Sequence, residues 1–375
     1  MNNKFLKGFF SEIESIPQVL QNSYLPSLDG LRGVAIIMVV LSHLVNTSRF
    51  YYDTVFNGHL GVLVFFVLSG FLITTLCIKE KVITKDISLK NFYIRRVLRI
   101  FPVAYLFILV VIILNYFFKL GISYINFIGT ALYLINFTSY FRKYYHTYFT
   151  GHFWSLSVEE QFYLMMPIIL KKNFRLYLWI VLIIVFVIPG FICLQYYFTS
   201  LNYIVFYVIT HYLIKFHAIA VGCLFSVLTF KYSFHKSFVS RNKVIFNILA
   251  IFLMLYLGYT DFFSLRDVLT GVACSFLIGY ILVSNIADAK DFIFRFLNSK
   301  YLKIVGTLSY SIYIWQEIFT SNDDRLPAFM VKFPSNIICI IIVSCLSYYF
   351  YERFFLKLKS KFSRVKNNKK LVVAS

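Results

Sequence analysis

Residues 24–43 have the sequence YLPSLDGLRGVAIIMVVLSH, and this stretch organises the interpretation of the whole chain. Pro26 to Gly30 form a break and a cap, and an apolar helix follows. Arg32 lies at the start of this helix and His43 lies near its end. At 1.5 Å and about 100° per residue, the two side chains share a face about 16 Å apart. An imidazole this far along an apolar helix, in register with a cation, predicts a functional site.

The composition indicates a membrane protein. Of the 375 residues, 59% are hydrophobic and only 14% are charged, which is too apolar for a soluble protein of this length. Many apolar runs approach the roughly 20 residues that a helix needs to cross a bilayer. The fold class predicted is therefore an all-α polytopic bundle with the lipid bilayer as its partner. A formal net charge of +21 would suggest nucleic acid in a soluble protein, but basic cytoplasmic loops account for it here, so no nucleic-acid partner is predicted.

The apolar runs predict about ten transmembrane helices. Their expected bounds are residues 31–45, 60–78, 100–117, 153–170, 176–194, 204–230, 244–259, 268–285, 302–319 and 335–355. Every second connection is rich in Lys and Arg, which places both termini in the cytoplasm. This alternation requires that residues 124–137 do not cross the membrane. That run is too short to span, so we expect an interfacial or re-entrant helix on the outer side.

We expect a single membrane domain at residues 25–355. A cytoplasmic leader at residues 1–24 precedes it, with no signal-peptide core, and a basic cytoplasmic tail at residues 356–375 follows. The six cysteines are scattered without ligand spacing, so neither a disulfide nor a metal site is predicted. Gly30, Gly33, Gly70 and Gly222 are expected to allow close helix approach rather than to bind ligands.

His43 is the leading catalytic candidate. Ionisable groups inside a membrane are costly and usually functional, and a neutral imidazole can accept a proton from an attacking hydroxyl. The alternative is a histidine that only packs against a neighbouring helix.

A second candidate region is HFWSLSVEEQFY at residues 152–163. Glu159 lies about 7 Å below Trp154 along this helix, and Ser155, Glu159 and Tyr163 share a face through their spacing of four. Glu159 is predicted to orient His43 or to hold a substrate hydroxyl. The alternative is that Glu160 faces water and Trp154 anchors the interface.

Two basic groups complete the candidates. The cytoplasmic loop NFYIRRVLRIFP at residues 91–102 carries Arg96 and Arg99 one turn apart, a spacing that suits bidentate binding of phosphates. Plain positive-inside charge explains these arginines equally well. His211 and Lys215, four residues apart near mid-membrane, either line a water-filled cavity or pair with a carboxylate of residues 153–170.

Five segments together resemble the acyltransferase family 3 membrane proteins, which O-acetylate bacterial surface glycans. They are SLDGLRG at 27–33 (running on to His43), FFVLSGFLI at 65–73, YIRRVLRIFP at 93–102, WSLSVEEQFY at 154–163 and GTLSYSIYIW at 306–315. The resemblance implies a ten-span fold and an acyl-CoA donor, usually acetyl-CoA, bound from the cytoplasm. It matches His43 to the family's essential histidine and Arg32 to its partner arginine. Arg96 and Arg99, with the neighbouring Arg95, match the donor-binding arginines, and Glu159 matches the carboxylate of its block.

The chain departs from the family pattern at three positions, Leu63, His217 and Gln316, the last standing where many relatives have histidine. We predict a multi-pass O-acyltransferase of the bacterial inner membrane that uses acetyl-CoA and no metal. Its acceptor is predicted to be a hydroxyl of a cell-surface glycan, such as O-antigen, or of a lipid-linked sugar. The expected substrate-binding residues are Glu160, Trp154, Ser155, Tyr163, His211 and Lys215. One rival hypothesis is a glycolipid transporter or flippase, but this sequence lacks the pairs of Gly/Pro-broken helices that transporters often have. The other is a receptor or structural module.

Overall fold

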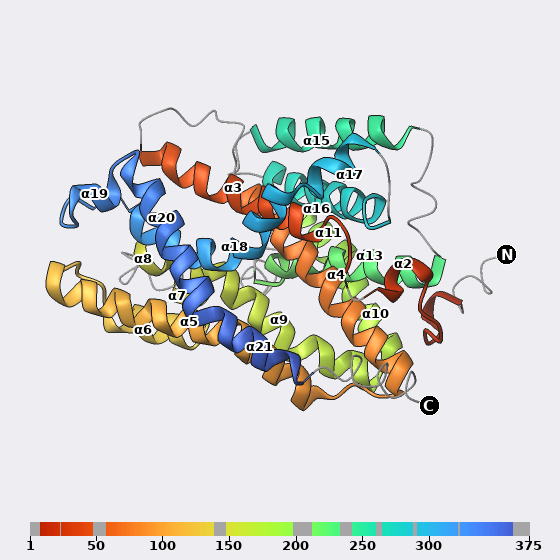
Figure 1. The fold of residues 1–375 in the computed structure, drawn as a ribbon. Coiled ribbons are helices and arrows are strands. Elements are labelled where there is room, and N and C mark those ends of the chain that lie inside the picture. The colour runs from red at the N-terminus through yellow and green to blue at the C-terminus, as the bar shows by residue number, and fades with distance from the viewer. Residues whose placement is uncertain are drawn as a thin grey trace. The chain divides into compact units, whose positions relative to one another are not determined.

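The computed structural model describes residues 8–22, 24–47, 58–138, 148–197, 212–232, 242–259, 265–287, 291–321 and 323–362. Within these ranges every regular element is a helix and no β-strand occurs (Figure 1), which confirms the all-α prediction. The elements are α2 (Gln18–Gln21), α3 (Leu28–Thr47), α4 (Gly58–Thr84), α5 (Leu89–Phe118), α6 (Tyr124–Ala131), α7 (Ile135–Thr138), α8 (Tyr148–Gly151), α9 (Phe153–Lys172), α10 (Phe174–Leu182), η2 (Ile183–Val187), α11 (Ile188–Tyr197), η4 (Ile214–Phe216), α13 (His217–Tyr232), α15 (Lys243–Tyr259), α16 (Leu265–Ser284), α17 (Phe292–Leu297), α18 (Lys300–Phe319), α19 (Ala328–Val331), α20 (Ser335–Leu346), η5 (Ser347–Glu352) and α21 (Arg353–Ser360).

Within the described residues each predicted span coincides with a helix or with a run of joined helices, and residues 204–211 of the sixth span lie outside them. Five stretches of the described chain are long and apolar enough to cross a membrane: Gly58–Thr84, Leu89–Phe118, Phe174–Gln195, Ile214–Tyr232 and Ser335–Ser360. Helices α15 and α16 contain shorter apolar segments, while α3, α9 and α18 are 20 residues long but carry more polar groups. Helix α6 has eight residues, far fewer than a membrane crossing needs.

The predicted cytoplasmic loop at residues 91–99 is wrong, because these residues are helical. Helix α5 begins at Leu89, where the Ser88 hydroxyl caps it by accepting from the Asn91 amide at 3.4 Å, and it continues through Pro102 to Phe118. Arginine is a good helix former, so a cluster of positive charge does not by itself mark a loop. Arg95, Arg96 and Arg99 therefore lie on one rigid helix.

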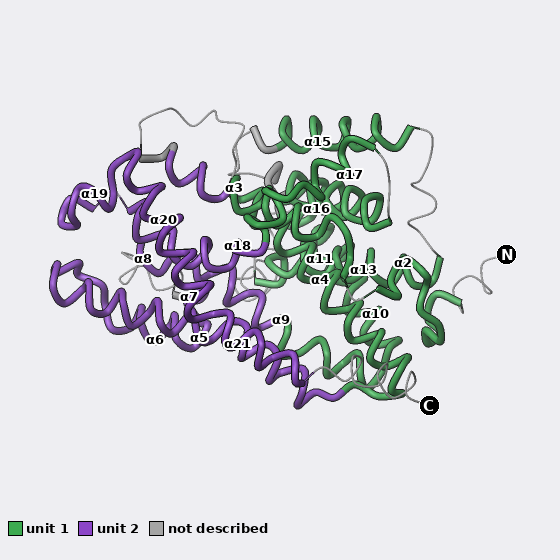
Figure 2. Tube along the Cα trace, in the orientation of Figure 1, with its two compact units in different colours: residues 1–38, 53–87, 162–306 green, residues 39–52, 88–161, 307–375 purple. Residues whose placement is uncertain are grey.

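The chain divides into two compact units (Figure 2), and the single membrane domain expected at residues 25–355 stays a prediction. Unit 1 contains Met1–Met38, Asp53–Ile87 and Phe162–Gly306. Unit 2 contains Val39–Tyr52, Ser88–Gln161 and Thr307–Ser375. Both units are assembled from segments distant in sequence, and the continuous helices α3, α9 and α18 each contribute to both. A division inside helices leaves no linker for sequence composition to reveal.

Unit 1 is built around the crossing of α4 and α13. A Cβ atom added at Gly70 would lie 1.8 Å from the Ile219 carbonyl oxygen, and one at Gly222 would lie 2.1 Å from the Val67 carbonyl oxygen. The two backbones therefore touch directly, as small residues allow in membrane helices. Gly30 and Gly33 in the same unit approach the backbones of residues 297 and 302 in the same way. These contacts confirm the packing role predicted for all four glycines.

The predicted leader is an integral part of unit 1. Leu20 is fully buried, the Lys79 ammonium donates to the Asn22 carbonyl at 2.9 Å, and Lys81 pairs with Glu12 at 2.9 Å. Helix α21 packs on α5 within unit 2 and extends to Ser360, so it includes the first residues of the predicted tail. Single apolar residues and polar contacts, spread along the segment, hold it in place. Such scattered contacts do not form an apolar run that could be recognised in the sequence.

A buried ion pair in unit 1 gives a first testable prediction. Lys243 is only 6% exposed, and its ammonium lies 2.8 Å from the Asp291 carboxylate, which also caps α17 by accepting from the Phe294 amide. Asp291→Asn retains a capping side chain but leaves Lys243 without its countercharge. We expect it to lower the free energy of unfolding by about 1–3 kcal/mol, measured as a lower Tm in detergent. Asp86→Asn, which breaks the exposed pair with Lys171, is the control and should change Tm little.

The same pair sets the direction of the pH dependence. Burial alone raises the pKa of Asp291, but the hydrogen bonds from Lys243 and Phe294 outweigh it and hold the pKa below its ordinary value of 3.8. A carboxyl with a lowered folded-state pKa stabilises the fold above its ordinary pKa and loses that effect on acidification. The Tm difference between wild type and Asp291→Asn should be full at neutral pH and should shrink as the pH falls below 3.8. A difference that stays constant through this range would contradict the assignment.

Candidate active site

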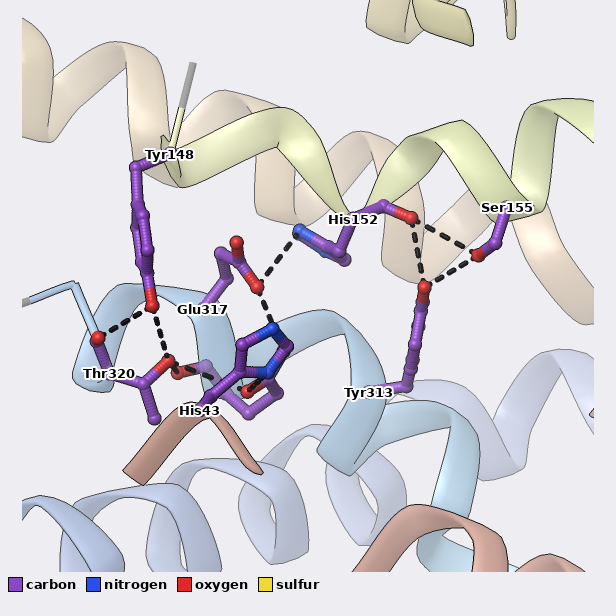
Figure 3. A network of polar contacts seen from close by, with 8 residues as sticks. His43, Tyr148, His152, Ser155, Tyr313, Glu317 and Thr320 are labelled. Atoms are coloured by element: carbon purple, nitrogen blue, oxygen red, sulfur yellow. Dashed lines mark hydrogen bonds and ion pairs between the residues drawn. The ribbon is translucent and has the colours of Figure 1, made fainter. Parts of the chain in front are cut away.

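His43 lies on the part of α3 that belongs to unit 2, where it meets α18 (Figure 3). Its Nδ1 atom lies 3.0 Å from Oε1 of Gln316. The hydrogen-bond partner found at Nδ1 is Gln316. The prediction that Glu159 orients this ring or holds a substrate hydroxyl stays a prediction. The amide belongs to a fully buried side chain, so water does not compete for this contact.

The Gln316 amide is connected in turn to a buried carboxylate. Gln316 Nε2 donates to Glu317 Oε2 at 2.9 Å, and the same oxygen lies 3.8 Å from Nδ1 of His152. Glu317 and His152 are each 5% exposed. Figure 3 shows His43, Glu317 and His152 close together, and we name these three residues and Gln316 the His43 network. Buried charges persist in proteins when they are paired or functional.

Aromatic rings fix the far end of the His43 network. The His152 ring meets Phe107 edge-on at 5.3 Å and Tyr313 at 5.5 Å between centroids. The Tyr313 hydroxyl donates to the His152 carbonyl at 2.9 Å and lies 2.5 Å from Ser155 Oγ. The hydroxyl of Ser155, which is predicted to bind substrate, therefore forms an internal contact with Tyr313, and its substrate-binding role stays a prediction.

Two further hydrogen bonds lie next to the His43 network at the end of α18. The Tyr148 hydroxyl donates to the backbone carbonyl of Thr320 at 2.6 Å, which fastens α8 to the end of α18. Thr320 Oγ1 donates to the backbone carbonyl of Gln316 at 3.1 Å. All the residues drawn in Figure 3 belong to unit 2. The geometry of the network is thus set within one packed body.

A second polar cluster in unit 2 contains Glu160 and Arg96. Glu160 Oε1 and the Tyr133 hydroxyl are buried, and neither has a hydrogen-bond partner within the described residues. Gln161 Nε2 donates to the Tyr133 carbonyl at 2.8 Å, and the Phe101 ring stacks on the Tyr133 ring at 5.2 Å. Tyr133 has φ of 54°, a conformation that is unusual for a bulky residue and is often found at functional sites. Unfilled buried hydrogen-bonding capacity of this kind suits a polar ligand.

The three arginines of α5 differ in their surroundings. Arg95 Nη1 donates to the Phe362 carbonyl at 2.8 Å, so it helps to hold the segment just after α21 on α5. Arg96 lies with its guanidinium 5.7 Å from the centre of the Phe92 ring, and both Arg96 and Arg99 are half-buried. The donor-binding role of all three arginines stays a prediction.

The remaining predicted site residues fall into three groups. Trp154 and Glu159 lie in unit 2, both half-buried. Arg32, paired with Asp29 at 3.1 Å, lies in unit 1, as do the buried Tyr163 and the half-buried Lys215. His211 lies outside the described residues. The roles of these residues stay predictions.

Sequence reasoning missed Glu317 and His152. Glu317 is an acidic residue inside an apolar helix, the same signal that selected Glu159, so it was accessible to the same argument. His152 precedes its helix and carries no such signal. No group of three or more metal-ligating side chains occurs in the described part of the chain, and the prediction that no metal takes part stays a prediction.

Comparison with known proteins now decides the family. A family model described as an acyltransferase domain matches residues 25–353. The chain belongs to this acyltransferase family. With the apolar helices described above, it is a multi-pass membrane protein.

Several relatives are named O-acetyltransferases. The chain is 29% identical to the peptidoglycan O-acetyltransferase OatA of Listeria monocytogenes, over 78% of this chain and 49% of that protein. It is 27% identical to the O-acetyltransferase OatA of Staphylococcus aureus strain MRSA252, over 94% of this chain and 62% of that protein. A putative O-acetyltransferase of S. aureus strain COL is 34% identical over 41% of this chain. The chain spans about half the length of the first of these relatives. No solved structure matches it significantly.

Proposed function

We propose that this protein transfers an acetyl group from acetyl-CoA to a hydroxyl of a cell-envelope glycan in the bacterial cytoplasmic membrane. The observation that carries the proposal is a half-buried, hydrogen-bonded histidine, His43, in a member of an acyltransferase family. Such a histidine can remove the proton from an acceptor hydroxyl, which makes the oxygen nucleophilic toward a thioester. Arg32 and Glu159 are proposed to assist, Arg32 by its charge at the start of α3 and Glu159 by holding the acceptor.

The donor is proposed to bind from the cytoplasmic side. Its phosphates would meet Arg96 and Arg99, which present guanidinium groups from adjacent turns of α5. The amide groups of its pantetheine arm suit the Tyr133 hydroxyl and Glu160, because an amide both donates and accepts. In this proposal the protein has ten membrane-spanning helices and both of its termini lie in the cytoplasm.

The acceptor is proposed to be a glycan presented from the outer side. Peptidoglycan is the first candidate because a relative is named for it, and other surface polysaccharides or a lipid-linked sugar are the remaining members of the class. Mass spectrometry of acetylated envelope glycans, in cells with and without the gene, tests the class. Unchanged acetylation of every envelope glycan after deletion would contradict the proposal.

Arg96 provides a prediction for the donor side. Arg96→Ala should raise the KM for acetyl-CoA at least about tenfold, since a charged hydrogen bond contributes about 1.5–3 kcal/mol, with a smaller change in kcat. Steady-state thiol release from purified protein measures both constants. Arg353→Ala is the matched control, because it removes the same charge from an exposed position of unit 2. An equal effect of the two variants would indicate general electrostatics rather than a phosphate site.

The transporter hypothesis predicts a different outcome in the same assay. An acetyltransferase in detergent or nanodiscs releases one thiol for each acetyl group transferred to an added glycan acceptor. A transporter or flippase for glycolipids releases none above the buffer background. Thiol release that depends on both the protein and the acceptor therefore separates the two functions.

A further inference from the structure

We propose that Gln316 and Glu317 are positioning residues that hold His43 with its proton on Nδ1 and the lone pair on Nε2. This inference rests on the proposed function, since it assigns the support of the base in that reaction. Neither Gln316 nor Glu317 was among the site residues predicted from sequence. The two residues are adjacent on α18 and act in series on His43.

The orientation of the Gln316 amide is fixed by its two neighbours. Gln316 Nε2 donates to Glu317 Oε2 at 2.9 Å, and this oxygen can accept from an amide NH₂ group whether or not the other oxygen carries a proton. The amide carbonyl is then turned toward His43, and Thr320 Oγ1 donates to the same oxygen at 3.4 Å. The assignment of nitrogen and oxygen thus follows from the network of hydrogen bonds.

This orientation determines the tautomer of His43. A carbonyl oxygen cannot donate, so the 3.0 Å contact requires His43 Nδ1 to carry the proton. In a neutral imidazole the lone pair then lies on Nε2, which is the atom available as a base. Without an acceptor at Nδ1, both tautomers would be populated and a fraction of the enzyme would present an N–H to the substrate.

Glu317 strengthens the contact when His43 becomes charged. Once Nε2 takes a proton, the imidazolium donates more strongly through Nδ1 to the Gln316 carbonyl. The hydrogen bond that the amide NH₂ group donates to Glu317 polarises that carbonyl in the favourable direction, since hydrogen bonds in a chain reinforce one another in a buried site. Gln316 is 0% exposed and Glu317 is 5% exposed, so solvent screens little of this effect.

His152 holds the carboxylate from the opposite side. Its Nδ1 lies 3.8 Å from Glu317 Oε2, and neither ring nitrogen has a hydrogen-bond partner within the described chain. Phe107 and Tyr313 hold the ring in place. Glu317 therefore lies between an amide donor and an imidazole, which leaves it little freedom to turn away from Gln316.

The reaction balances with His43 unchanged at the end. The acceptor O–H bond breaks and its proton moves to Nε2, while the oxygen bonds to the thioester carbonyl carbon. The carbon–sulfur bond then breaks, and the departing thiolate takes the proton from Nε2. Throughout these steps the Nδ1 proton stays in its hydrogen bond with Gln316.

The test compares two replacements of Gln316 in the full chain in nanodiscs. Gln316→Met keeps the side-chain volume but removes the acceptor, and we expect kcat to fall about 100-fold with the KM for acetyl-CoA within about twofold. Gln316→Glu keeps an accepting oxygen and can share a proton with Glu317, so it should recover most of the lost kcat. Ser321 follows α18, and its described side-chain hydrogen bond is to the Ile318 carbonyl. Ser321→Ala is the control and should match wild type.

A spectroscopic measurement separates positioning from general damage. In protein labelled with ¹⁵N-histidine, His43 should show a protonated Nδ1 and a bare Nε2, and Gln316→Met should shift it toward the other tautomer. Wild-type kcat in Gln316→Met, or a proton on Nε2 in the wild type, would overturn the inference. If wild type releases no thiol from acetyl-CoA, the proposed function fails, while the tautomer measurement still decides the role of Gln316.

Discussion

Replacement of His43 by alanine should abolish acetyl transfer while leaving the protein folded in the membrane. A positioned general base typically contributes between about 10²-fold and 10⁴-fold to the rate, and alanine offers no group that can take the proton. His43 is half-buried on α3 and its one described hydrogen bond is to Gln316, so few packing contacts depend on it. We therefore expect kcat for glycan acetylation to fall by at least about 100-fold with little change in Tm.

The adjacent residue provides a matched control for this experiment. The Ser42 hydroxyl donates to the Val39 carbonyl of its own helix at 2.8 Å, and Ser42→Ala should retain wild-type activity. Both variants should elute from size exclusion as wild type does and should bind acetyl-CoA equally well. Acetylation by His43→Ala at the wild-type rate, in correctly inserted protein, would remove His43 from the chemistry and with it the proposed function.

The helices were predictable because their signal is local. A run of apolar side chains long enough to cross a bilayer has few alternatives to a helix, and each of the predicted spans meets one in the structure. Gly70 and Gly222 were also predictable as packing residues, since glycine inside an apolar helix has little other use. The start of α5 was not, because the arginines that mark a cytoplasmic face are equally compatible with helix and loop.

The composition of the active site depends on contacts that local sequence does not encode. His43 and Gln316 are 273 residues apart, and nothing in either segment names the other. Sequence reasoning selected His43 as the leading catalytic candidate and Glu159 of α9 to orient it or to hold the acceptor, and both roles stay predictions. Gln316, whose amide lies between His43 and Glu317, was not selected as a site residue. The sequence argument looked for ionisable residues inside apolar helices, and glutamine carries no formal charge.

Replacement of Gly70 or Gly222 by alanine should destabilise the protein strongly, because either change adds a methyl group where two backbones touch. The added carbon would lie 1.8 Å or 2.1 Å from a carbonyl oxygen of the opposite helix, so α4 and α13 must move apart. Overpacking of this kind costs about 1–3 kcal/mol and sometimes more, and backbone atoms cannot swing aside as a flexible side chain can. We expect each variant to show a clearly lower Tm and a lower yield of monodisperse protein.

A third glycine in unit 1 isolates this effect from helix propensity. Gly271 lies on α16, and a Cβ atom added there meets nothing within 4 Å. Alanine is favoured over glycine within a helix by about 0.5–1 kcal/mol, so Gly271→Ala should leave Tm unchanged or raise it. The sign of the change should thus differ between chemically identical substitutions in one unit. If Gly70→Ala and Gly222→Ala melted at or above the temperature of Gly271→Ala, the direct backbone contact between α4 and α13 would be wrong.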